Sequence, residues 1–192
     1  LNDTYRNVPF NSLVKDSTWR AKVIKSKTYI FDNDGKMKTG LVAVGMPDVN
    51  GSDYTKVDTS SANSLIAGAV SKKLDAGYYY FNGANGSVKG QMMTGKVTIE
   101  DDGDTYHYYF EKSTGKAALN TVKDGVVYGP TGDRIQADDG NTNMIYHVDA
   151  DITYGKYVIK AGSDIIVSST GKLRTSGKGV KVDGVKYDIT SS

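Results

Sequence analysis

The sequence lacks the residues that most catalytic and metal sites require. It has no cysteine, one tryptophan, three prolines and two histidines, His107 and His147, among 192 residues. The missing cysteines exclude disulfides, thiol nucleophiles and cysteine-based metal sites, and two histidines are too few for a multi-histidine site. Neither a Gly-x-Ser-x-Gly elbow, nor a His-Glu-x-x-His helix, nor a phosphate-binding loop occurs. We therefore expect no metal and no cofactor, whereas a pair of carboxylates for glycoside hydrolysis stays open on composition alone, because any two of the 22 Asp and Glu residues could meet in space.

Long apolar runs and an excess of one charge are also missing. A membrane-spanning helix needs roughly 20 apolar residues, and no run approaches that length. Lys plus Arg number 24 against 22 Asp plus Glu, and the basic residues are scattered rather than gathered in a stripe. We expect neither nucleic acid nor membrane insertion. Lys178, Lys181 and Lys186 form only a weak patch that would suit an anionic wall polymer.

What the sequence does contain is tyrosine, glycine and a recurring phrase. Fourteen tyrosines and 22 glycines favour short strands joined by tight turns. In each complete copy of the phrase, an aromatic or aliphatic strand residue precedes a glycine by four or five positions. The five pairs are Phe31 and Gly35, Phe81 and Gly86, Phe110 and Gly115, Tyr128 and Gly132, and Val167 and Gly171. Residues 183–189 resemble the first half of a sixth copy.

A β-branched or aromatic run followed by a polar loop with glycine is the pattern of a β-hairpin. One hairpin is marginal in water, so such units must stack and bury their apolar faces against their neighbours. The sequence therefore predicts an all-β fold, a β-hairpin repeat solenoid with insertions. The array spans 19–192, after a linker or the end of an upstream domain at 1–18.

Two insertions are expected within the array, at about 41–74 and 138–160. The first contains polar cap-type residues before an apolar patch at 58–74, which is compatible with one short helix or with a loop. The second contains two further apolar runs, 144–148 and 156–159, which predict strands.

Residues 29–40 and 78–82 resemble the bacterial cell-wall-binding repeat, the family of choline-binding modules, glucan-binding domains and clostridial toxin repeats. This resemblance implies a β-hairpin solenoid on a bacterial or phage protein, displayed outside the cell and associated with the cell surface or wall. It implies a binding module attached to a catalytic or adhesin domain. The expected partner is a cell-wall polysaccharide or glucan.

The family's choline sites are aromatic cages that hold a quaternary ammonium by cation–π attraction. A ring at the opening position of each repeat belongs to the cage. In this sequence only Tyr78 and His107 offer a ring there, and we therefore expect no choline binding. The six opening positions are Thr28, Tyr78, His107, Gly125, Asp164 and Gly184.

The acidic segments 32–35 and 100–104 are interpreted as turns, because Asp, Asn and Gly are residues that tight turns select. The leading hypothesis is a non-catalytic module that binds carbohydrate. Aromatic density is highest in 78–81 and 106–110. Because the phenylalanines carry no hydroxyl that needs a partner, they are expected in the core. Alternation along each strand then places Tyr78, Tyr80, His107 and Tyr109 toward the carbohydrate.

Two alternatives remain open. The array is a structural spacer or adhesin stalk without a glycan ligand, or it is the targeting part of a larger cell-wall hydrolase or glycosyltransferase.

Overall fold

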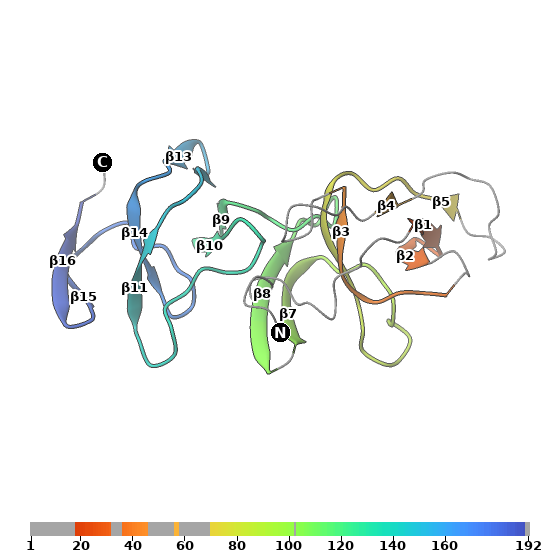
Figure 1. Cartoon of the computed structure of the whole chain (residues 1–192), viewed down its shortest axis with the longest axis horizontal. Coiled ribbons are helices and arrows are strands. Elements are labelled where there is room, and N and C mark those ends of the chain that lie inside the picture. The colour runs from red at the N-terminus through yellow and green to blue at the C-terminus, as the bar shows by residue number, and fades with distance from the viewer. Residues whose placement is uncertain (1–17, 32–35, 46–55, 58–69, 102, 191–192) are drawn as a thin grey trace. The chain divides into compact units, whose positions relative to one another are not determined.

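The computed structural model describes residues 18–31, 36–45, 56–57, 70–101 and 103–190. These residues form sixteen strands and no helix, as the repeat pattern predicts. The chain divides into two compact units, 1–117 and 118–192, and each is described by itself. In both units most strands form short antiparallel pairs (Figure 1).

The first unit contains three antiparallel strand pairs and two additional short strands. Strand β1 also pairs with β4 in parallel and with β5 antiparallel. The three antiparallel pairs are β1 (Thr18–Ile24) with β2 (Lys27–Phe31), β3 (Gly40–Val44) with β6 (Gly77–Phe81), and β7 (Gly95–Asp101) with β8 (Asp104–Phe110). The short strands are β4 (Lys56–Val57) and β5 (Val70–Ser71).

The second unit contains four antiparallel pairs. Strand β12 also lies parallel to β9, where Thr153 faces Thr121. The pairs are β9 (Thr121–Lys123) with β10 (Val126–Tyr128), β11 (Asn143–His147) with β14 (Asp164–Ser168), β12 (Ile152–Tyr154) with β13 (Tyr157–Ile159), and β15 (Gly177–Val182) with β16 (Val185–Ile189).

Each glycine loop of the sequence phrase is closed by a single β-bridge. The bridge joins the last residue of the aromatic or aliphatic strand to the residue two positions after the glycine. The five bridges are Phe31–Met37, Phe81–Met92, Phe110–Ala117, Tyr128–Arg134 and Val167–Leu173. In the second copy this regularity selects Gly90, with a φ of 79°, rather than the Gly86 chosen from spacing alone. The longer pairing of each phrase strand is with a strand that precedes it in the chain.

The same post-glycine residue also connects successive repeats. The backbone N–H of Met92 donates to the carbonyl of Thr28 (2.8 Å), and that of Ala117 donates to Tyr78 (2.8 Å). In the second unit Leu173 donates to Gly125 in the same way (2.9 Å). Each acceptor is the opening position of the preceding repeat, so a ladder of backbone bonds joins copies one to three in the first unit and copies four and five in the second.

The loop glycines allow this stacking to be tight. Gly115 has a φ of 77°, and a Cβ placed on it would lie 2.6 Å from the Cε atom of Met92 in the preceding repeat. A Cβ on Gly171 would lie 2.5 Å from Cγ of Arg134. Glycine therefore serves two purposes at this position, because it adopts the positive φ and leaves room for the neighbouring side chain.

Each unit has its own apolar core. In the first, Ile30, Val42, Tyr79 and Phe81 are almost completely buried in one cluster. Phe110 is also fully buried, which confirms the prediction that Phe81 and Phe110 are core residues. The second unit's cluster is aliphatic and comprises Val122, Val127, Val148, Ile152 and Val167.

The two expected insertions have different outcomes. Residues 41–44 belong to β3, a paired strand of the array, and 58–69 lie outside the described residues, so the expectation of a helix or loop there is not tested. In 138–160 the two expected strands are present as β11 and β13, together with β12. Strand β11 pairs with β14, so the β12–β13 hairpin is the segment inserted between the two partners.

Candidate functional site

Strands β7 and β8 form a regular hairpin with one apolar and one polar face. Val97 and Ile99 of β7 lie opposite Tyr108 and Tyr106 of β8, and all four side chains are buried. The alternate residues point the other way and are exposed or half-buried. We call this second surface the polar face; its cross-strand pairs are Lys96 with Tyr109, Thr98 with His107, and Glu100 with Thr105.

The polar face places several kinds of polar group beside an aromatic ring. Thr98 Oγ1 lies 3.3 Å from His107 Nδ1, within hydrogen-bonding distance. Tyr109 and His107 are half-buried, whereas Lys96, Thr98 and Glu100 are exposed. Directly opposed residues on an antiparallel pair have Cβ atoms about 4.5–5.5 Å apart, so these side chains are neighbours. The face therefore offers a ring, hydroxyls, an imidazole and both signs of charge to a ligand in solvent.

Tyr80 does not join this face. Its ring stacks on Phe110, with centroids 6.2 Å apart and planes at 26°. Phe110 in turn stacks on Tyr108 at 5.6 Å. Tyr80 is half-buried, and burial raises the pKa of its hydroxyl, an effect that a hydrogen bond with the Gly83 backbone opposes. Because Phe110 and Tyr108 belong to the apolar face of β8, Tyr80 is separated from His107 and Tyr109 by that strand.

Tyr78 is only 5 % exposed, so the expectation that its ring faces a groove is wrong. Its neighbour Tyr79 is 1 % exposed, and both faces of this part of β6 are therefore covered. The next repeat reaches this strand: the Ala117 N–H donates to the Tyr78 carbonyl, and the Lys116 side chain lies over Gly77. Strand alternation separates two faces but does not show whether a second layer covers the outer one.

Sequence reasoning did not identify Lys96, Thr98 and Glu100 as site residues. The signal was present, because the polar and apolar residues of 95–101 alternate as expected for a half-buried strand. Pairing this segment with 104–110 would have placed the three side chains opposite Tyr109, His107 and Thr105. The repeat phrase drew attention only to the aromatic strand of the pair.

The two acidic segments differ in whether the structure describes them. Asp101 pairs with Asp104 across the end of the β7–β8 hairpin, which confirms the turn interpretation there, and 32–35 lie outside the described residues. Within the described part of the chain, no group of three or more His, Asp or Glu side chains is placed to bind a metal ion.

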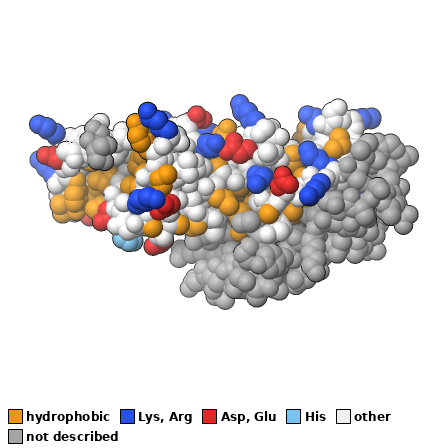
Figure 2. Space-filling view, turned by 90° about the horizontal axis from the view of Figure 1, so that it is seen from above, with side chains coloured by type: hydrophobic (Ala, Val, Ile, Leu, Met, Phe, Trp, Pro, Cys, Tyr) orange, Lys and Arg blue, Asp and Glu red, His pale blue; other side chains and the backbone are white. Residues whose placement is uncertain are grey.

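The face seen in Figure 2 shows basic and acidic side chains interspersed. A search of the described residues for a helix able to cross a membrane finds none.

No family model and no curated protein matches the chain in the comparisons made. Solved structures do match, among them two choline-binding or cell-surface proteins, an autolysin and an alternansucrase. CbpJ from Streptococcus pneumoniae is 20 % identical over 90 % of this chain and 46 % of its own, with a TM-score of 0.33. The modular autolysin LytC from the same species is 17 % identical over 90 % and 32 %, with a TM-score of 0.31.

Choline-binding protein F from Streptococcus pneumoniae is 25 % identical over 63 % of this chain and 41 % of its own, with a TM-score of 0.26. The chain thus spans less than half of the length of each of these three structures. At such TM-scores the overall superpositions carry no argument, and the description of the fold rests on the strand pairing and ladder of this chain.

Proposed function

We propose that the chain is a non-catalytic module that binds cell-wall or extracellular carbohydrate, with the polar face of the β7–β8 hairpin as its binding surface. The observation that carries the proposal is the row formed by the half-buried Tyr109 and His107 and the exposed Thr98, on a strand pair whose opposite face is buried. A tyrosine ring provides apolar area for a sugar face together with a hydroxyl. The flanking hydroxyl, imidazole and ammonium groups suit the hydroxyls of a glycan.

The rigidity of the hairpin supports this proposal. Seven register positions, from Gly95 with Phe110 to Asp101 with Asp104, are paired without a bulge. The buried rings of Tyr106, Tyr108 and Phe110 fix the strand from the other side. A ligand therefore meets side chains that are already positioned, which reduces the ordering cost of binding.

A binding role suits these side chains better than catalysis. Acid–base catalysis and oxyanion stabilisation work best where water is excluded and donors are fixed. His107 is half-buried and its neighbour Thr98 is exposed, on a surface open to solvent. The matched structures include proteins named for choline binding and an autolysin. We extend to this chain only attachment to a bacterial surface polymer, outside the cell, and not choline itself.

The proposal is tested on a glycan array with the intact chain and two variants. Tyr109→Ala removes the ring of the polar face, and Tyr80→Ala removes a ring that lies on the other side of β8. We expect the wild type and Tyr80→Ala to bind the same neutral polysaccharides and Tyr109→Ala to lose them. An array without any bound glycan, or one in which Tyr109→Ala binds like the wild type, contradicts the proposal and favours the spacer or stalk.

A further inference from the structure

The β12–β13 hairpin carries an aromatic pair that the repeat does not require. Ile152 and Ile159 lie opposite each other at its base; Ile152 is 1 % exposed and both belong to the core of the second unit or pack against it. Two residues further out, on the same face, Tyr154 lies opposite Tyr157. These tyrosines are 36 % and 63 % exposed, in contrast to the buried Tyr128 of the same unit.

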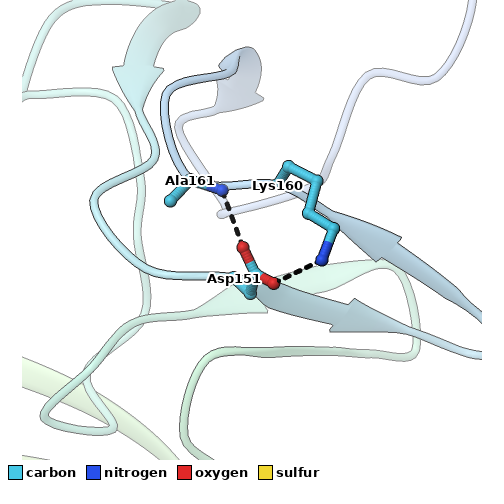
Figure 3. A network of polar contacts seen from close by, with 3 residues as sticks. All are labelled: Asp151, Lys160 and Ala161. Atoms are coloured by element: carbon cyan, nitrogen blue, oxygen red, sulfur yellow. Dashed lines mark hydrogen bonds and ion pairs between the residues drawn. The ribbon is translucent and has the colours of Figure 1, made fainter.

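The hairpin is fixed at its base by polar contacts. Asp151 accepts hydrogen bonds from Lys160 Nζ (2.8 Å) and from the backbone N–H of Ala161 (2.9 Å), as Figure 3 shows. These bonds, with Lys160 as the largest cause, lower the pKa of the Asp151 carboxyl. On the other edge, the Thr153 N–H donates to the Asn120 carbonyl (2.9 Å), and Thr121 Oγ1 donates to the Thr153 carbonyl (3.1 Å). The tyrosine pair therefore projects from a hairpin whose two ends are joined to each other at its base and whose β12 edge is attached to β9.

The charge at the tip is positive. Asp151, Lys156 and Lys160 are the charged residues of segment 151–161, and Asp151 and Lys160 neutralise each other at the base. Lys156 remains, with its Nζ 5.3 Å from the centroid of the Tyr157 ring. Tyr157 retains its 63 % exposure despite this contact, so ring surface is available beside a cation.

We propose that the tip of the β12–β13 hairpin is a second glycan site, specific for sugars that carry a carboxylate or a phosphate. The rings of Tyr154 and Tyr157 provide apolar area for a pyranose face, and the Lys156 ammonium meets the acidic substituent. Charge complementarity selects an anionic glycan over a neutral one, because the only uncompensated charge of the hairpin is the Lys156 cation. The inference rests on the carbohydrate-binding function proposed above but uses different residues in the other unit.

The test is a titration of the intact chain with three probes: oligogalacturonate, a phosphorylated mannan oligosaccharide and neutral maltoheptaose. We expect one or both anionic probes to bind and maltoheptaose to bind this hairpin at least about tenfold more weakly. Tyr157→Ala should weaken the anionic probe about tenfold, as truncation of an aromatic anchor does. Tyr157→Phe keeps the ring and should bind like the wild type. Lys156→Met should weaken the anionic probes and flatten the salt dependence of their affinity.

Tyr187→Ala is the control, because Tyr187 is an exposed tyrosine like Tyr154, at 36 %, but lies on β16. It should bind the anionic probes like the wild type. Binding of an anionic probe that survives both Tyr157→Ala and Lys156→Met overturns the inference, as does the absence of binding to both anionic probes. Loss of anionic binding in Tyr109→Ala, with the hairpin variants unaffected, would place the ligand on the polar face and leave only the proposed function standing.

Discussion

At the scale of single residues, the environment of a tyrosine in this chain depends on what covers its strand. Alternation in 106–110 correctly separates the buried Tyr106 and Tyr108 from the half-buried His107 and Tyr109. The same rule fails for Tyr78, because the next repeat covers the outer face of β6. Sequence patterning therefore predicts the faces of a strand, whereas the number of layers packed on it follows from the tertiary stacking.

The first prediction concerns the core. Phe81 is fully buried, and Phe81→Ala should lower the free energy of unfolding by about 3–5 kcal/mol, because it removes a large side chain and leaves a cavity. Tyr109→Ala, on the half-buried polar face, should cost far less. Urea denaturation of both variants measures the difference. Equal losses of unfolding free energy in the two variants would contradict the assignment of Phe81 to the core and of Tyr109 to the half-buried polar face.

The second prediction concerns alkaline pH. The Tyr79 hydroxyl donates to the Asp75 carbonyl (2.8 Å), and burial, with a smaller effect of the Asp75 charge, raises its pKa from 10.0 to about 12. Because the folded pKa exceeds the unfolded one, Tyr79 contributes stability that is fully present below pH 10 and is lost as the pH rises toward 12. The free energy of unfolding of the wild type should therefore fall more between these pH values than that of Tyr79→Phe. Parallel pH profiles for the two proteins would contradict this assignment.

At the scale of the element, the glycine loop was predictable and its neighbours were not. Five strand–loop–glycine phrases predicted five loops, and each is closed by a bridge. The spacing indicated Gly86 in the second copy because Gly86 lies five residues after Phe81. This loop is longer than the others, and Gly86 and Gly90 both have a positive φ. Only the bridge from Phe81 to Met92 identifies Gly90 as the equivalent position. The partner strand that precedes each phrase, such as 95–101, has no shared motif and was not assigned.

The third prediction separates the two purposes of the loop glycine. In Gly115→Ala the new Cβ is attached to a backbone with a φ of 77° and lies against the side chain of Met92. In Gly103→Ala the φ is 84°, but no atom lies within 4 Å of the new Cβ. Gly103→Ala should cost about 1–2 kcal/mol of unfolding free energy from backbone strain alone. Gly115→Ala should cost about 0.5–1.5 kcal/mol more, because the end of the Met92 side chain must leave its rotamer to make room.

The control for this comparison is the double variant Met92→Ala with Gly115→Ala. If steric contact between repeats causes the extra loss, the two substitutions should couple, and the double variant should be more stable than the sum of the single effects implies. Additive effects, or equal losses for Gly103→Ala and Gly115→Ala, would show that the glycine is needed only for its backbone conformation.

At the scale of the whole molecule, the all-β repeat architecture could be predicted because short-range patterning repeats. The division into two units could not, since it depends on contacts between distant segments rather than on composition. The inserted β12–β13 hairpin was seen only as part of a longer insertion. Its pairing with β9 through Thr121 and Thr153 joins segments that share no recognisable pattern.

The fourth prediction concerns choline. Of the six opening positions, four carry no ring, namely Thr28, Gly125, Asp164 and Gly184, and Tyr78 is buried. Millimolar choline should therefore leave the melting temperature unchanged. A ligand at 100 times its Kd would add about 2.7 kcal/mol, which a thermal scan detects easily. A clear upward shift would reveal a cage formed by other rings.

The most direct test of the central claim is an NMR titration of the intact chain with the glycan selected on the array. The account predicts progressive shifts of the Tyr109 ring and the His107 imidazole, with smaller changes at Lys96 and Thr98 and none at the buried rings of Tyr79 and Phe81. Shifts confined to residues away from the β7–β8 hairpin, or no shifts at saturating glycan, would contradict the claim that the polar face is the carbohydrate-binding surface.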